Sequence, residues 1–150
     1  MIRELCLAPV IMAGIISTVE LNTAVSQETS GSGQILSVQT CDRGWGLEAK
    51  ATTIGLYGAG VQYGMQWEPA ETFSVTLTPR FGVSYADRPM KELPQRTQFG
   101  LGAALSLGYG SARIGVELFH LSNGKAFGLN VDEGQNIGLN TVILTTGWVF

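Results

Sequence analysis

The chain has 150 residues and a net charge of −3; 45% of its residues are hydrophobic, 14% are charged and 20 are glycine. This length fits a single domain, and the composition excludes both a disordered chain and a coiled coil. The mildly acidic balance argues against a nucleic-acid partner. The chain is as apolar as a membrane protein, yet no run of about 20 apolar residues could cross a bilayer as a helix. Its hydrophobicity is therefore either that of a soluble β core diluted by glycine or the alternating pattern of a membrane β-barrel.

The N-terminal segment has the features of a secretory signal peptide. Arg3 precedes the apolar stretch 5–16, and Ala24-Val25-Ser26 offers a small-x-small cleavage site. A buried N-terminal strand is the alternative interpretation of the same stretch. We predict a signal peptide over residues 1–26.

The rest of the chain divides at its first polar stretch. Residues 27–43 are interpreted as a polar leader or a first strand, and residues 44–150 as an outer-membrane β-barrel. Cleavage after about Ser26 would remove Cys6 and leave Cys41 as a single cysteine. The predicted fold therefore has no internal disulfide.

Apolar and polar side chains alternate with a period of two over much of the chain, which is the pattern of β-strands rather than of helices. The clearest strands run for roughly 10 to 14 residues, a length that suits a tilted membrane crossing. The apolar faces consist of Tyr57, Ala59, Val61, Tyr63, Met65, Trp67, Phe73, Val75, Leu77, Phe81, Val83, Tyr85, Phe99, Leu101, Ala103, Leu105, Leu107, Tyr109, Ile114, Val116, Leu118, Val142, Leu144, Trp148 and Phe150.

The opposite faces of these strands carry mostly Gly, Ser, Thr, Gln and charged residues, which would make a poor core for a soluble sandwich. In a small membrane barrel they line the narrow interior, where Arg80, Arg113 and Glu117 could pair, and the apolar faces meet lipid. Glycine on a water-exposed strand is costly without a reason, so the barrel is the better interpretation. We predict an all-β fold, an antiparallel up-and-down transmembrane β-barrel.

The sequence predicts the presence of β-strands more clearly than it predicts their number. Five strands are clear between residues 57 and 150, and residues 35–41 and 44–53 could supply two more. Bacterial barrels have an even number of strands and at least eight. We therefore expect eight strands. The eighth would have to come from the N-terminal region, which conflicts with a signal peptide there.

The connections between strands favour an outer-membrane barrel. Residues 68–71 and 110–111 form tight connections, whereas 87–95 and 124–135 are long, as expected for periplasmic turns and outer loops. Aromatic residues gather at both ends of the strands, as in the belts of membrane proteins. The chain stops on Phe150, which resembles the C-terminal signal that such barrels present to the barrel assembly machinery. We predict a protein of the bacterial outer membrane, in contact with its lipids.

A candidate catalytic site lies near the end of a predicted strand. The only histidine, His120, is followed two residues later by Ser122. Residues two apart in a strand share a face with about 7 Å between their Cα atoms, so the imidazole can reach the hydroxyl and act as its general base. Both have the parity of the apolar face and so point outward, where polar residues are costly unless functional or near the interface. Asn140 has the same parity. If Ser111, at the start of this strand, is level with Phe150, antiparallel partners on the last two strands have residue numbers that sum to about 261. Partners on the same face need an even sum, so 260 places Asn140 opposite His120 and 262 places it opposite Ser122.

Two motifs in this region resemble the lipid A 3-O-deacylase family of outer-membrane acyl hydrolases. They are His120-Leu121-Ser122-Asn123 and Asn136-Ile137-Gly138-Leu139-Asn140. The resemblance implies an eight-stranded barrel with a Ser–His–Glu triad on its outer surface that removes an acyl chain from lipopolysaccharide. By position it makes Ser122 the nucleophile and His120 the base. It also assigns Asn123 and Gly124 to the oxyanion hole.

The residue that orients the histidine departs from this family, which has a glutamate where this chain has Asn140. An amide accepts the imidazole hydrogen bond but cannot offset an imidazolium charge. Either Asn140, or Asp132 or Glu133 from the preceding loop, is expected to orient His120. An asparagine in this role also resembles outer-membrane phospholipase A, which uses calcium, works as a dimer and has twelve strands, more than this chain can form.

We therefore predict an outer-membrane carboxylic ester hydrolase that removes a 3-hydroxyacyl chain from the lipid A of lipopolysaccharide. A phospholipase A-like acyl hydrolase and a non-catalytic structural barrel are the alternatives. The sequence has no phosphate-binding loop, no paired cysteines and one histidine, so neither a cofactor nor a metal is expected. The oligomeric state, monomer or homodimer, is left open.

Overall fold

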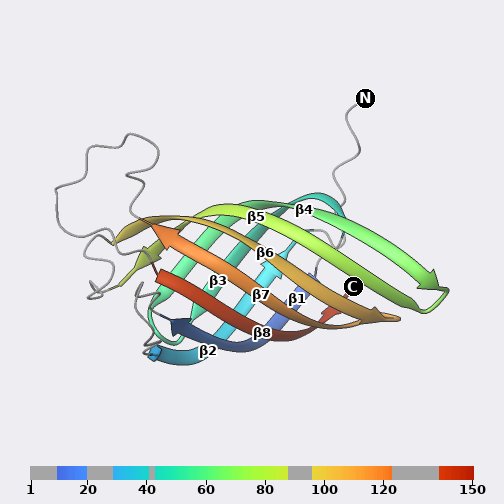
Figure 1. The fold of residues 1–150 in the computed structure, drawn as a ribbon, viewed down its shortest axis with the longest axis horizontal. Coiled ribbons are helices and arrows are strands. Elements are labelled where there is room, and N and C mark those ends of the chain that lie inside the picture. The colour runs from blue at the N-terminus through green and yellow to red at the C-terminus, as the bar shows by residue number, and fades with distance from the viewer. Residues whose placement is uncertain (1–9, 20–28, 41–42, 88–95, 123–138) are drawn as a thin grey trace, which may run out of the picture.

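The protein is a closed barrel of antiparallel strands that follow one another in chain order (Figure 1). The computed structural model describes residues 10–19, 29–40, 43–87, 96–122 and 139–150. Within them no helix is long and apolar enough to span a membrane. The predicted all-β barrel of eight strands is confirmed. The strands are β1 (Val10–Val19), β2 (Thr29–Gln39), β3 (Gly44–Thr52), β4 (Leu56–Ala70), β5 (Phe73–Ala86), β6 (Thr97–Tyr109), β7 (Ala112–Ser122) and β8 (Leu139–Val149).

The eighth strand comes from the N-terminal segment. Val10–Val19 forms β1, which pairs with β2 on one side and with β8 on the other. The apolar stretch predicted as part of a signal peptide is thus a strand of the barrel wall, and residues 27–43 supply the second strand. A cut after Ser26 would remove β1 and leave two unpaired strand edges in the membrane, which is costly. The signal peptide over residues 1–26 stays a prediction beside this strand, and the intact mass of protein purified from membranes tests whether cleavage occurs.

The faces of the strands follow the predicted alternation. Large apolar side chains are exposed on the outer surface, while most polar side chains of the same strands are buried in the lumen. Aromatic residues are exposed toward both ends of the barrel, as predicted for a protein that spans a membrane. Those nearer the end that carries the C-terminus are Trp45, Trp67, Phe73, Tyr109, Trp148 and Phe150, and those nearer the other end are Tyr57 and Tyr85.

The two ends of the barrel differ. The hairpin of β4 and β5 protrudes at the end where the C-terminus lies, and its turn is only residues 71–72 because β4 continues to Ala70 (Figure 1). We call the opposite end the outer end. There β3 and β4 are joined by residues 53–55, a short connection at the end where long outer loops are expected. The long connections predicted at 87–95 and 124–135 lie almost wholly outside the described residues.

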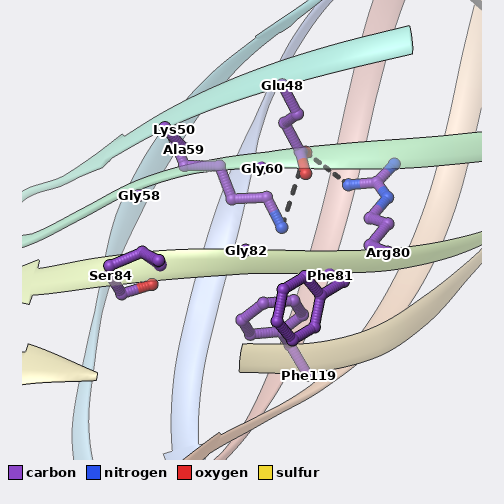
Figure 2. Close-up of a pocket in the computed structure, with 11 residues that line it drawn as sticks. Glu48, Lys50, Gly58, Ala59, Gly60, Arg80, Phe81, Gly82, Ser84 and Phe119 are labelled. Atoms are coloured by element: carbon purple, nitrogen blue, oxygen red, sulfur yellow. Dashed lines mark hydrogen bonds and ion pairs between the residues drawn. The ribbon is translucent and has the colours of Figure 1, made fainter. Parts of the chain in front are cut away.

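Four charged side chains meet in the middle of the lumen and balance one another. This four-charge cluster consists of Glu48 and Lys50 on β3, Arg80 on β5 and Glu117 on β7. Figure 2 shows the first three of these side chains. Nη1 of Arg80 donates to Oε1 of Glu48 at 2.5 Å and to Oε2 of Glu117 at 2.6 Å. Nζ of Lys50 lies 3.4 Å from Oε1 of Glu48 and also pairs with Glu117. The predicted pairing of Arg80 with Glu117 is confirmed, whereas Arg113 donates to main-chain oxygens at the β6–β7 turn.

An apolar layer closes the lumen between the four-charge cluster and the outer end. Leu56, Ala86 and Leu121 form one buried group, and Ile35 and Ile143 form another. Each of these side chains is at most 4% exposed. These side chains therefore support the strands near the outer end from inside the barrel.

Gly60 marks a close approach of β4 to β5. A Cβ atom on Gly60 would lie 2.5 Å from the main-chain oxygen of Phe81. We therefore expect Gly60→Ala to lower the free energy of unfolding by about 1–3 kcal/mol, because the main chain would have to shift. Gly58→Ala is the matched control on the same face of β4, since its tightest contact would be the movable hydroxyl of Ser84, at 3.1 Å, and the nearest main-chain atom, the oxygen of Val83, would lie 3.6 Å away. Urea unfolding in detergent micelles measures both, and equal midpoints would contradict this prediction.

Candidate active site

The three predicted catalytic residues lie at the outer end of β7 and β8, on the outer surface of the barrel. His120 is exposed, and Ser122 and Asn140 are half-buried. Their neighbours Leu121 and Thr141 are each 2% exposed and face the lumen. Because successive side chains of a strand point to opposite faces, the three polar residues point away from the lumen. The outward orientation predicted from parity is confirmed.

The pairing of β7 with β8 places His120 directly opposite Asn140, the first of the two predicted registers. Nδ1 of His120 lies 2.9 Å from Oδ1 of Asn140. An amide oxygen only accepts hydrogen bonds, so Nδ1 carries the hydrogen, and in the neutral imidazole Nε2 is then the nitrogen with the lone pair. The imidazole is thus held in the tautomer that a general base acting through Nε2 requires.

Ser122 is the last residue of β7 and lies on the same face as His120. On β6 the register partners of Ser122 and His120 are Phe99 and Leu101. Leu101 is 65% exposed and Leu118 is 61% exposed, so the surface around the polar group is strongly apolar. This arrangement places a hydroxyl and an imidazole at the rim of a lipid-facing surface, where the ester groups of a membrane lipid would lie.

The residues directly behind the site were not among those predicted from the sequence. Phe119 and Thr141 face the lumen between the exposed positions, and Nζ of Lys50 lies 4.7 Å from the centre of the Phe119 ring. Glu48 and Lys50 had a sequence signal, because they are charged residues two apart on the polar face of a possible strand. No sequence signal pointed to Phe119 or Thr141, since an aromatic residue or a threonine that faces the lumen is common in a small barrel.

Other predicted contributors lie outside the described residues. These are Asn123 and Gly124 of the oxyanion hole and the alternative acids Asp132 and Glu133, whose roles stay predictions. Among the side chains that the structure does describe, no group of three or more His, Cys, Asp or Glu could hold a metal ion.

An apolar outer surface, aromatic residues at both ends and a closed ring of eight antiparallel strands define an integral β-barrel of the bacterial outer membrane. The sequence also identifies the protein family. Residues 24–149 match the sequence profile of the family described as lipid A 3-O-deacylase (PagL). The chain belongs to the lipid A 3-O-deacylase family, as the motifs around His120 and Asn140 predict.

Solved structures share this fold. The outer membrane enzyme PagL superposes with a TM-score of 0.57 and 11% identity, over 92% of this chain and 98% of that chain. Neisserial surface protein A (NspA) superposes with a TM-score of 0.60 and 11% identity, over 95% of this chain and 97% of that chain. At such low identity the similarity shows the fold alone. No curated protein sequence matches this chain.

Proposed function

We propose that this protein is a lipid A deacylase that removes a 3-hydroxyacyl chain from lipopolysaccharide, with Ser122 as nucleophile and His120 as general base. The observation that carries this proposal is the 2.9 Å hydrogen bond between His120 and Asn140, beside a serine on the same outward face. Membership of the lipid A 3-O-deacylase family supports the choice of substrate.

The reaction follows the chemistry of serine esterases. Nε2 of His120 accepts the hydroxyl proton of Ser122 as Oγ attacks the ester carbonyl. The tetrahedral intermediate expels the sugar oxygen, which takes this proton from the imidazole. A water molecule, deprotonated by the same imidazole, then attacks the acyl-serine, and the released Oγ of Ser122 takes that proton back from the imidazole as the 3-hydroxy fatty acid leaves. By resemblance to the family, the segment after Ser122 supplies the hydrogen bonds to the oxyanion.

The position of the site suits a substrate that stays in the membrane. A lipid of the outer leaflet reaches the outer surface of β7 and β8 by lateral diffusion. Its acyl chains can lie against the exposed Leu101, Leu118 and Leu144 while an ester group lies level with His120. The lumen is not where such a lipid would bind, because the four-charge cluster and the apolar layer lie inside it whereas His120 lies on the outer surface.

The mass spectrum of lipid A tests the proposal. In a Gram-negative host, cells that express the protein are expected to lose one 3-hydroxyacyl chain from their lipid A, as the family reaction implies. Ser122→Ala should abolish this loss because the nucleophile is gone. Ser106→Ala on β6 is the matched control, since Ser106 lies on the lumen face, and it should retain the activity.

The same experiment separates the alternatives. Lysophospholipid together with intact lipid A would favour a phospholipase A-like hydrolase, for which an asparagine hydrogen-bonded to the histidine is the specific observation. Unchanged lipids in cells that contain the folded barrel would reject catalysis on both lipid classes and favour a structural barrel.

A further inference from the structure

We propose that Thr141 is a positioning residue for the His120–Asn140 pair and acts from inside the barrel through the main chain of β7. This inference rests on the proposed function, because the group that it positions is the proposed general base. Thr141 itself is 2% exposed and faces the lumen, so it does not touch a substrate on the outer surface.

The hydroxyl of Thr141 joins β7 and β8 one residue away from the site. Oγ1 donates to the main-chain oxygen of Phe119 at 3.0 Å, and Phe119 is the register partner of Thr141. That oxygen belongs to the peptide group linking Phe119 to His120, and Thr141 directly follows Asn140. The bond therefore ties the peptide before His120 to the residue after Asn140. Any slip of β7 against β8 at this point would break the bond and lengthen the 2.9 Å contact between His120 and Asn140.

The apolar surroundings of the Thr141 hydroxyl strengthen its hydrogen bond to Phe119. Leu121 and Ile143, the inward neighbours of Phe119 and Thr141 along β7 and β8, are each 2% exposed and belong to the apolar layer. A hydrogen bond is stronger where water does not compete for its groups. A buried hydroxyl without a partner is also costly, so the arrangement that satisfies Thr141 is favoured over slipped ones.

Phe119 is held from its other side as well. A Cβ atom at Gly100 would lie 2.0 Å from Cε1 of Phe119, and one at Gly102 would lie 2.4 Å from its Cδ2. The ring thus occupies space that these two glycines of β6 leave open. It borders the same cavity as Lys50, whose Nζ lies 4.7 Å from the ring centre (Figure 2). With its ring fixed by β6 and its carbonyl oxygen fixed by β8, the residue before His120 has little freedom to move.

The single histidine makes this proposal directly measurable, because ¹⁵N-labelled histidine reports on His120 alone. For the full chain folded in detergent micelles, NMR should show a protonated Nδ1 and an unprotonated Nε2. Thr141→Val keeps the shape and removes the hydroxyl. It is expected to increase the Nε2–H tautomer and to lower kcat roughly fivefold with KM unchanged, because the substrate contacts are intact. Thr141→Ser keeps the hydroxyl and should restore both values.

Thr145→Val is the matched control. Thr145 lies on the same strand and the same face, farther from the site, and its register partner on β7 is Gly115. This variant should leave both the histidine spectrum and kcat as in the wild type. Equal effects of the two valine variants would indicate a general loosening of β8 and would overturn the proposal.

The remaining outcomes separate this inference from the proposed function. A folded Thr141→Val protein with an unchanged tautomer and an unchanged kcat would overturn the positioning role while leaving the deacylase proposal intact. A wild-type protein that hydrolyses no lipid A, but whose tautomer shifts in Thr141→Val and returns in Thr141→Ser, would support the positioning role and reject the deacylase proposal.

Discussion

A His120→Gln variant is expected to lose deacylase activity by roughly 10²–10⁴-fold, the range that a general base contributes. Glutamine can still hydrogen-bond at this exposed position, but its amide cannot accept the proton of Ser122. The rate of fatty-acid release from lipid A by the purified variant measures the effect. Thr146→Val, on the exposed face of β8 and away from the site, is the control and should keep the wild-type rate. Wild-type activity in His120→Gln would show that the imidazole is not the base.

Asn140→Asp is expected to raise the activity of the same site rather than lower it. The aspartate places a carboxylate oxygen where the amide oxygen now accepts from Nδ1 of His120 at 2.9 Å. The tautomer is unchanged, but the imidazolium that forms during attack gains a charge partner. A hydrogen bond to a charged group is stronger by about 1–1.5 kcal/mol, so kcat is expected to rise roughly tenfold. Asn140→Leu, which removes the acceptor, should lower kcat, and an equal rate in all three proteins would exclude Asn140 as the orienting residue.

The largest effect on stability is expected from Glu117→Gln. The Glu117 side chain is 5% exposed and pairs with Arg80 and Lys50, so the variant leaves two buried cations facing only Glu48. Breaking one partner of a buried charge cluster costs about 3–5 kcal/mol, because the remaining charge is uncompensated. The free energy of unfolding in urea, measured in micelles, should fall by this amount.

Glu68→Gln is the control for this prediction. Glu68 is 60% exposed and lies 3.9 Å from Arg43, which is 72% exposed. Such a pair contributes about 0–1 kcal/mol, so this variant should unfold almost as the wild type does. Adding Lys50→Met to Glu117→Gln restores the charge balance of the lumen and is expected to recover much of the lost stability. Similar stabilities of the two single glutamine variants would contradict a structural role for the four-charge cluster.

The outward site could be predicted from the sequence because it depends on local and nearby features. Strand parity alone determines that His120, Ser122 and Asn140 share a face. The register of β7 with β8 follows from aligning the turn at residue 111 with the end of the chain, and the structure has the first of the two predicted registers. The pairing of Arg80 with Glu117 was predictable for the same reason, since both lie on the polar face of clear strands.

The first strand could not be assigned in this way. An apolar stretch followed by small residues fits both a signal peptide and a wall strand, and its place in the barrel depends on pairing with β8, at the far end of the chain. The hydrogen bond from Thr141 to Phe119 could not be predicted either, because it also depends on how the strands pair. A threonine on the polar face can bond to any group across the lumen or the ladder, and its partner is determined only once the strands are in register.

The most direct test is the release of 3-hydroxy fatty acid from purified lipid A by the purified, folded protein in detergent, with Ser122→Ala measured in parallel. We expect the wild type to release the fatty acid and Ser122→Ala to fall to the level of a reaction without protein. Equal release by the two proteins, or none by the folded wild type, would contradict the assignment of Ser122 as the nucleophile of a lipid A deacylase.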